Sequence, residues 1–433
     1  MGLPGLLIGL ILSQAPAFAQ STVNADARAQ IPARNPEAAR QESGALLEGR
    51  GILDRARPEY DALGVPLGAS TLFPSLATGI SVDDNIYRAP AGTTSAVFTI
   101  SPRLELRSGW EQDSLQLYGQ LDHYHYADQD SESRTNWILG AAGRKDLAPG
   151  AFLSGNTYFF DTHETRTSPD LSLLALSPTR YRRLHADGAA SRQSGVITLS
   201  AAANYDRFDF DRTQLAGGGS IGNGDRNRDV YQLSARAAYE MVPGQMLFLQ
   251  AIYDRRDFDR LLDRNGLNRD SDGYRLDLGA SMMVTPVIRA SGYVGLLQQN
   301  HAPPLADTST LDFNLQIDWF ATELMTGHFT AARVIDDTTI AGASSVDVQQ
   351  FGVSLDYELL REVILQPYLR YDDQSFQGIP RNDRIVSAGI EARYLMNGNF
   401  ALYANYAFQQ RDTNAVGRDF SSNVFTVGLR SQL

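Results

Sequence analysis

The sequence has no cysteine among its 433 residues. This absence excludes disulfides, thiol chemistry and a lipid anchor attached through a cysteine side chain. A chain without thiols is typical of a protein that is exported unfolded through an oxidising compartment. The composition therefore favours a place outside the cytoplasm, without indicating a function.

Long apolar runs are missing as well. The one strongly apolar run, residues 3–12, is much shorter than the about 20 residues that a transmembrane helix requires. A hydrophobic content of 43% and a mean hydropathy of −0.27 are also too polar for a bundle of membrane-spanning helices. The run precedes the small-residue motif Ala17-Phe18-Ala19, so we predict a cleaved secretory signal over residues 1–19, although no lysine or arginine stands before it.

Positive charge is scarce, and catalytic motifs are absent. The chain has 38 Lys and Arg against 50 Asp and Glu, and the resulting net charge of −12 argues against a nucleic-acid partner. No H-E-x-x-H, G-x-S-x-G or P-loop pattern occurs. We therefore predict no enzymatic activity, no cofactor and no metal.

Two polar patterns nevertheless have the residue types of a metal site. His123 and His125 share one face of a strand at a spacing that could ligate a metal, but their tyrosine neighbours favour residues at a strand's outer end. Residues 83–85 (Asp-Asp-Asn) resemble a calcium-binding cluster. They lack the further spaced ligands and the glycine of an EF-hand loop, which favours a solvated loop tip.

What the chain does have, from residue 72 onward, is strand-like alternation of apolar and polar residues. In residues 96–106 the even positions are mostly apolar, whereas Arg103, Glu105 and Arg107 stand between or beside them. These stretches run for roughly 10–16 residues, longer than the about 5–6 of a globular strand and sufficient for a tilted membrane crossing. Alternation alone also fits a two-sheet sandwich, so the connections must decide between the two.

The connections alternate between tight turns and long polar loops. Tight turns occur at residues 147–150, 242–245, 285–286, 359–362 and 396–399, whereas stretches such as 254–272 are rich in Asp, Arg and Asn. A barrel that crosses a membrane sorts its connections in this way, with one tight rim and one rim of longer loops. We predict an all-β, transmembrane, antiparallel up-and-down β-barrel of about eighteen strands, or sixteen if two blurred segments are not strands.

Several predicted strands end in an aromatic residue next to an acidic one. The motifs begin at Phe160, Tyr205, Tyr253 and Tyr371, and the last three also contain Phe208, Phe258 and Phe376. Aromatic residues followed by charges are expected where a barrel wall leaves the lipid, so we predict a girdle; ordinary strand-terminal aromatics are the alternative. The last strand alternates as well and ends on the apolar Leu433.

The polar faces of these strands would line the lumen. They mix both charge signs with amides and tyrosines, which suits water and hydroxylated solutes but selects no single ion. Pairing of these charges to stabilise the wall is the alternative reading. The predicted pore-lining residues are Arg103, Glu105, Arg107, Tyr118, Asp122, Arg144, Arg236, Arg275, Asp277, Arg289, Asp312, Asn314, Asp318, Asp356, Arg393 and Arg430.

One stretch carries a family resemblance. Residues 60–68 (YDALGVPLG), followed by 72–76 (LFPSL) and 83–87 (DDNIY), resemble the entry segment of an outer-membrane β-barrel porin family, the "β-barrel porin 2" group. The resemblance covers nearly all of residues 57–433. Members often accompany exopolysaccharide or capsule machinery, so it implies an outer-membrane pore for polymer export. It defines no binding-site residues.

Taken together, these patterns predict three segments: a signal peptide (1–19), a periplasmic N-terminal lead (20–70) and an outer-membrane β-barrel (71–433) of a Gram-negative bacterium, with both termini periplasmic. Polymer export is the leading hypothesis for its function. A general diffusion porin for small hydrophilic solutes, and an enzyme or adhesin using the long loops, are the alternatives. Expected partners are outer-membrane lipid and lipopolysaccharide, a periplasmic polysaccharide-export protein, and the barrel-assembly machinery during biogenesis.

Overall fold

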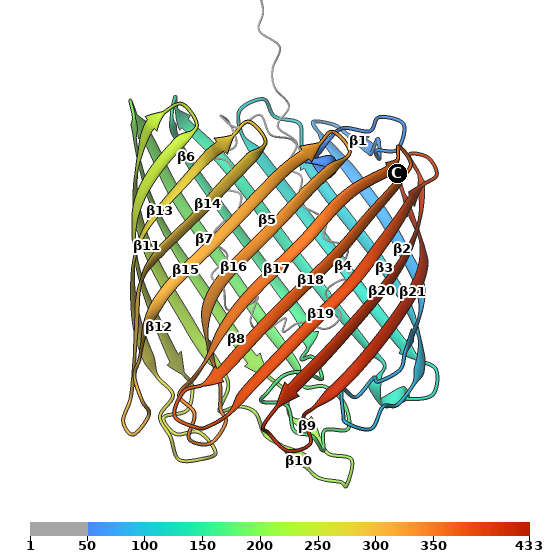
Figure 1. Ribbon diagram of the computed structural model, residues 1–433, viewed down its shortest axis with the longest axis vertical. Coiled ribbons are helices and arrows are strands. Elements are labelled where there is room, and N and C mark those ends of the chain that lie inside the picture. The colour runs from blue at the N-terminus through green and yellow to red at the C-terminus, as the bar shows by residue number, and fades with distance from the viewer. Residues whose placement is uncertain (1–50) are drawn as a thin grey trace, which may run out of the picture.

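The structure is a computed structural model that describes residues 51–433. The predicted signal peptide and most of the predicted lead lie outside the described residues. No helix within residues 51–433 is long and apolar enough to cross a membrane. The described chain instead forms a β-barrel whose strands are strongly tilted against its axis (Figure 1).

Nineteen strands belong to one sheet, and all of them except the short β1 (Val65–Leu67) form the barrel wall. Two further short strands, β9 (Thr213–Gln214) and β10 (Ser220–Ile221), pair with each other in a loop. The short helices are η1 (Ile52–Asp54) and η2 (Asp130–Glu132). The eighteen wall strands are β2 (Ser70–Asp83), β3 (Ser95–Ser108), β4 (Ser114–Tyr126), β5 (Arg134–Ala148), β6 (Ala151–His163), β7 (Arg180–Ser194), β8 (Ile197–Phe210), β11 (Arg228–Val242), β12 (Gln245–Phe258), β13 (Ser271–Thr285), β14 (Ile288–His301), β15 (Thr308–Thr322), β16 (Met325–Asp337), β17 (Ser345–Leu360), β18 (Val363–Phe376), β19 (Asn382–Leu395), β20 (Phe400–Thr413) and β21 (Phe420–Gln432).

The wall is closed. Each strand pairs antiparallel with the next along the chain, β8 pairs with β11, and β21 pairs with β2 from Ser75↔Gln432 to Asp83↔Val424. Closure leaves no unpaired edge, which is what a sheet surrounded by lipid requires. The prediction of an antiparallel barrel of eighteen strands is confirmed, and the two blurred segments are β7 and β16.

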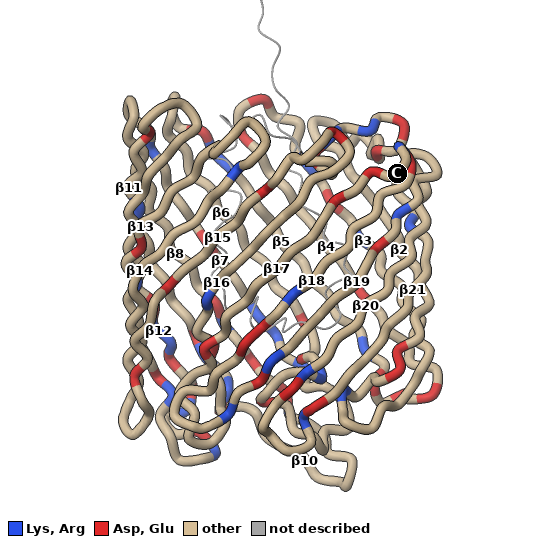
Figure 2. Tube along the Cα trace, in the orientation of Figure 1, with Lys and Arg blue, Asp and Glu red and all other residues tan. Residues whose placement is uncertain are grey.

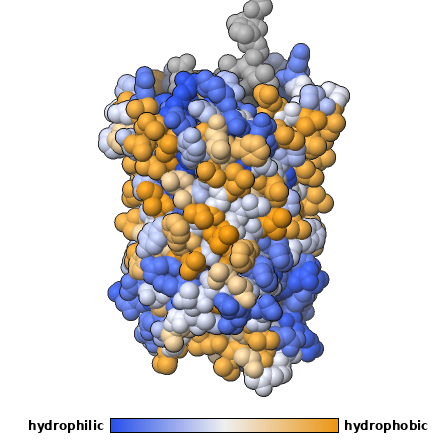
Figure 3. Space-filling view, turned by 90° about the vertical axis from the view of Figure 1, so that its right-hand side faces the viewer, coloured by the Kyte–Doolittle hydropathy of each residue, from blue (hydrophilic) through white to orange (hydrophobic). Residues whose placement is uncertain are grey.

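The two faces of the wall differ as the alternation predicted. On β3, Phe98 and Leu104 are 45% and 55% exposed on the outer face, whereas Glu105, which follows Leu104 and points to the other face, is only 3% exposed. A globular core would show the reverse, with apolar side chains buried and charges exposed. In Figure 3, apolar residues cover much of the outer wall and polar residues gather toward its ends. The apolar face is therefore the outer one, and the polar face lines the lumen.

The two ends of the barrel also differ. Tight turns such as 149–150, 243–244 and 286–287 lie at the end that carries β1 and the C-terminus. The long connections, including 164–179 and 211–227, lie at the opposite end, near which many of the charged residues gather (Figure 2). We call these the turn end and the loop end.

The aromatic motifs at the strand ends are divided between the two faces. Tyr205 and Tyr253 lie on the outer face, where their rings stand 5.4 and 5.2 Å from those of Tyr231 and Tyr274. Phe208, which is 2% exposed, instead faces inward, and so do Phe160, Phe258 and Phe376. Their assignment to a lipid-facing girdle was wrong. Residues an odd number of positions apart point to opposite faces of a strand, so the phenylalanines of these motifs lie opposite their tyrosines.

Candidate functional site

The residues predicted to line the pore all lie on the lumen face of the wall. Register shows this directly for several of them: Arg236 lies opposite the buried Gln250, and Asp356 opposite the buried Thr326. Asp277 and Asp312 are 0% and 1% exposed. Whether solute passes along them stays a prediction, because orientation alone does not show transport.

Four of these residues belong to one polar ladder that crosses six adjacent strands, β14 to β19. Arg289 contacts Asp318 at 2.8 Å, and Nδ1 of His328 lies 2.8 Å from Asp318 Oδ1. Nε2 of His328 lies 3.1 Å from Asp356 Oδ2. The ladder then continues from Asp356; its members His328, Gln366 and Glu391 were not among the residues predicted to line the pore. Asp356 accepts from Gln366 (2.9 Å), Gln366 accepts from Arg393 (3.1 Å), and Arg393 pairs with Glu391 (2.9 Å).

The remaining predicted residues are dispersed over the wall. Glu105 is paired by its neighbours Arg103 (2.9 Å) and Arg107 and by Gln116 (2.7 Å). The Arg144 guanidinium lies 3.7 Å from the ring centroid of Phe152. Most of these charges thus have a partner on the wall itself, and the structure does not gather them into one site.

The loop end contains the feature that the sequence analysis missed. Residues 164–179, between β6 and β7, extend across the barrel mouth; we call them the crossing loop. Asp170 Oδ1 accepts hydrogen bonds from the Thr339 backbone N–H (2.8 Å) and the Thr338 hydroxyl (2.9 Å), on the loop between β16 and β17. Eight wall strands, β7, β8 and β11 to β16, separate these two loops. Contact over that distance requires the crossing loop to span the mouth.

A second attachment on the far side comes from β20 and the loop that follows it. Arg411, on the lumen face of β20, donates to the Thr167 carbonyl, and Arg418 donates to the carbonyls of Ser168 (3.3 Å) and Leu171 (2.8 Å). Thr167, Ser168 and Leu171 are 2–3% exposed. The middle of the crossing loop is therefore enclosed rather than lying on top of the mouth.

Neighbouring loops hold the base of the crossing loop. Arg166 pairs with Glu132, which is 1% exposed, and its guanidinium lies 5.2 Å from the Tyr87 ring centroid. Ala175 forms a β-bridge with Leu215 in the loop between β8 and β11. At the start of the crossing loop, Glu164 forms a two-fold ion pair with Arg226. Three further loops thus fix its position.

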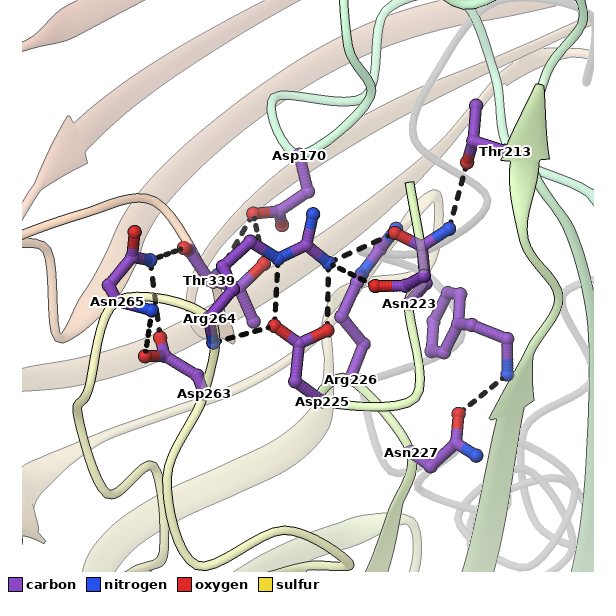
Figure 4. A network of polar contacts seen from close by, with 12 residues as sticks. Asp170, Thr213, Asn223, Asp225, Arg226, Asn227, Asp263, Arg264, Asn265 and Thr339 are labelled. Carbon is purple, nitrogen blue, oxygen red and sulfur yellow. Dashed lines mark hydrogen bonds and ion pairs between the residues drawn. The ribbon is translucent and has the colours of Figure 1, made fainter. Parts of the chain in front are cut away.

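The loops also join one another, as Figure 4 shows. Arg264 makes two 2.7 Å contacts with Asp225, and Asn265 donates to the Thr339 carbonyl (3.0 Å). Burial alone would raise the pKa of Asp225, but the hydrogen bonds from Arg264 outweigh burial and hold that pKa below its ordinary value. The same direction applies to the pKa of Asp263, where backbone N–H groups and Arg269 outweigh burial.

The turn end is also partly occupied from inside. Ile52, in η1, is 0% exposed, and Arg57 contacts Glu358 of β17 at 2.7 Å. The Tyr60 carbonyl accepts from Gln432 (3.2 Å) on β21. Residues 51–60 therefore lie inside the turn end against one side of the wall, between β17 and β21.

The residues of the two candidate metal-binding patterns form contacts with other side chains. His123 lies on the outer face near the loop end, with Nδ1 2.8 Å from the Thr135 hydroxyl. Asp83 pairs with Arg88 (2.9 Å), and Asp84 accepts from Asn423 (2.7 Å). Within residues 51–433, no group of three or more His, Asp or Glu side chains is arranged to hold a metal ion.

Comparison with solved structures returns outer-membrane barrels at low identity. OccK2 (OpdF) of Pseudomonas aeruginosa, solved with glucuronate, is 12% identical, with 85% of this chain and 99% of that chain covered and a TM-score of 0.46. The siderophore receptor PirA of Acinetobacter baumannii is 8% identical, with 83% and 80% covered and a TM-score of 0.45. No curated protein matches.

The family comparison is more direct, and it agrees with the closed wall, the polar lumen and the apolar outer face. The matching family model is described as "Putative beta-barrel porin 2", and the match extends over residues 57–433, which include the whole barrel. The chain belongs to this porin family and is a porin-like channel of the Gram-negative outer membrane.

Proposed function

We propose that this barrel is a gated channel for small hydrophilic solutes, with the crossing loop as its gate. The observation that carries the proposal is the attachment of one loop to the opposite rim through Asp170 and Arg418. An eighteen-stranded barrel is wide enough for an aqueous path unless something occupies it. Here the occupant is a loop, and its attachments are hydrogen bonds that can exchange with water.

The lumen wall supports the solute class. Its charges are mixed in sign and largely paired along the wall, as in the ladder from Arg289 to Arg393. Paired charges offer hydrogen bonds to water and hydroxyl groups but create no ring of a single sign that would select an ion. No step of this proposal requires a catalytic group.

The orientation belongs to the proposal too. Long loops face the outside and tight turns the periplasm in outer-membrane barrels, so the gate would face the medium. Both ends of the barrel-forming segment would then be periplasmic.

Polymer export, which the family resemblance implies, is less well supported. A polymer occupies the mouth throughout its passage, so the crossing loop would have to release all of its far-side attachments for that whole time. Small solutes need only brief openings. A periplasmic export protein, lipopolysaccharide and the assembly machinery stay predicted partners.

A disulfide lock tests the gate. The chain has no cysteine, so the double substitution Asp170→Cys with Thr339→Cys introduces a single pair at positions already in contact. Oxidised protein in planar bilayers should stay in a low-conductance state, and dithiothreitol should restore openings. Each single substitution serves as the control and should not respond to the reductant.

Two results would contradict the proposal. One is equal conductance in the oxidised and the reduced double variant, with the disulfide verified by mass spectrometry. The other is a deletion strain that loses surface polysaccharide but takes up small solutes normally, which would favour export.

A further inference from the structure

Two arginines hold the far side of the crossing loop through neutral acceptors. Arg418 donates to the carbonyls of Ser168 (3.3 Å) and Leu171 (2.8 Å), and it forms no ion pair in the described part of the chain. Arg411, which is 3% exposed, donates to the Thr167 carbonyl. Its Nε has no hydrogen-bond partner among the described residues. Both guanidiniums are therefore bonded to backbone carbonyls rather than to acidic side chains.

Seven other arginines at the loop end pair with a carboxylate instead. A carboxylate compensates a buried guanidinium more fully than a carbonyl does, because it also carries the opposite charge. The pairs are Arg166 with Glu132, Arg226 with Glu164, Arg228 and Arg256 with Asp337, Arg264 with Asp225, Arg269 with Asp263, and Arg381 with Asp383. The attachment of the crossing loop through Arg411 and Arg418 differs from this pattern.

The carboxylate that Arg411 reaches is already bonded to other groups. Asp383 accepts from Arg381 (2.9 and 2.6 Å) and from the Thr413 hydroxyl (2.5 Å), whereas the Arg411 Nε lies 3.9 Å from it. Burial and the Arg381 guanidinium lower the pKa of Arg418, and the attraction of nearby carboxylates does not offset them. Three guanidiniums thus have one carboxylate in contact with them.

An anion would compensate Arg411 and Arg418 better than the loop carbonyls do. A carboxylate or phosphate group offers two oxygens to a guanidinium, and it brings the negative charge that this part of the mouth has too little of. Arg418 is half-buried, so an anion from the medium can reach it before the crossing loop moves. The anion takes the place of the loop backbone and needs no cavity beneath the loop.

We propose that Arg411 and Arg418 form a binding site for a small soluble oxyanion of the carboxylate or phosphate class, which replaces the crossing-loop carbonyls and releases the gate. The inference rests on the proposed function, because it concerns the attachment that holds the loop closed. It adds the chemical class of the ligand that opens the gate. The guanidiniums have a partner in both states, so opening does not leave them buried without compensation.

Thiol labelling measures the release of the loop. Ser168→Cys places a nearly isosteric thiol at a position that is 2% exposed, in a chain that has no other cysteine. We use the full-length protein in a nonionic detergent without phospholipid, so that free phosphate is the only phosphate present. Sodium phosphate should accelerate maleimide labelling by about five- to tenfold, the gain when an anion replaces a neutral acceptor. Sodium chloride at the same ionic strength controls for screening and should not reproduce the increase.

The charge at position 418 should decide this response. Arg418→Gln can still donate to a carbonyl but carries no charge, so phosphate should no longer accelerate labelling of the Ser168→Cys thiol. Arg418→Lys keeps the charge and should keep a response. Arg384→Gln is the matched control, because Arg384 is exposed on the outer face at the same end of the barrel, and it should respond like the parent.

Heat-modifiable gel mobility checks that each variant is folded. If Arg418→Gln does not fold, Arg411→Gln should abolish the response in the same way. The inference is overturned if phosphate accelerates labelling of the parent no more than sodium chloride does, or if the folded glutamine variant responds in full. A phosphate response together with a disulfide lock that leaves conductance unchanged would overturn the gate alone. A working lock without a phosphate response would overturn the anion site alone.

Discussion

Asp170 accepts hydrogen bonds from Thr339 although the two residues lie on loops separated by eight strands of the barrel wall. Around the other side, ten strands, β17 to β21 and β2 to β6, separate them. The crossing loop therefore reaches from one side of the mouth to the other. Because few side chains hold it at the far side, single substitutions can test this attachment.

Replacing Asp170 with alanine should increase the open probability of the channel. The change removes the acceptor of three hydrogen bonds, from the Thr338 hydroxyl and from the backbone and hydroxyl of Thr339. A hydrogen bond to a charged group contributes about 1.5–3 kcal/mol net of competition with water, so the closed state should lose much of its advantage. Planar-bilayer recording measures the effect. Asp412→Ala, at the loop end of β20, is the matched carboxylate control, and an unchanged open probability in Asp170→Ala would refute the role assigned to this side chain.

Acid should loosen the loop network. The pKa values of Asp225 and Asp263 are held below the ordinary value of about 3.9 by Arg264, by Arg269 and by backbone N–H groups. Their contribution to stability is therefore complete above about pH 4 and is lost as the pH falls through the lowered pKa values. Pepsin cleavage within residues 259–270 should accelerate below about pH 4, relative to cleavage of heat-unfolded protein at each pH. Asp225→Asn should be cleaved readily at pH 4 already; equal resistance of this variant and the wild type at pH 4 would count against the network.

Much of the wall could be predicted because the face on which a strand residue lies follows from its position in that strand alone. One face of every barrel strand contacts lipid and the other faces the lumen. Alternation therefore places Leu104 outside and Glu105 inside without knowledge of any other strand. β7 was harder to recognise since its outer face carries Ala186, Gly188 and Ala190, which contrast weakly with the polar face. The inward phenylalanines could have been placed by the same counting rule that placed the tyrosines.

The mouth could not be predicted because its contacts join residues far apart in sequence. Asp170 and Thr339 are 169 positions apart, and Arg411 and Thr167 are 244 apart. Nothing in a run of Asp, Arg and Ser distinguishes a loop that reaches across the lumen from one that projects into solvent. The only available signal was the density of such residues in the long connections, which indicates polar contacts but not their partners.

The polar ladder should contribute to the stability of the wall. His328→Ala would leave Asp318 and Asp356, 3% and 6% exposed, without the imidazole between them. We expect a loss of about 1–3 kcal/mol in the free energy of unfolding, the usual cost of leaving a buried polar group without its partner. Urea titration followed by tryptophan fluorescence can measure it, using the 3 tryptophans of the chain. His125→Ala, on the exposed outer face, should stay within about 0.5 kcal/mol; a similar loss in both variants would show that the ladder has no special role.

Cysteine labelling should establish which end of the barrel faces the medium. Val416, in the loop between β20 and β21, is 96% exposed, and Glu323 lies exposed in the tight turn between β15 and β16. Because the native chain has no thiol, Val416→Cys and Glu323→Cys each present a single reactive site. With loops outside, a membrane-impermeant maleimide should label Val416→Cys in intact cells, whereas Glu323→Cys should be labelled only after the outer membrane is permeabilised. The opposite pattern would reverse the orientation and place the crossing loop at the periplasmic opening of the channel.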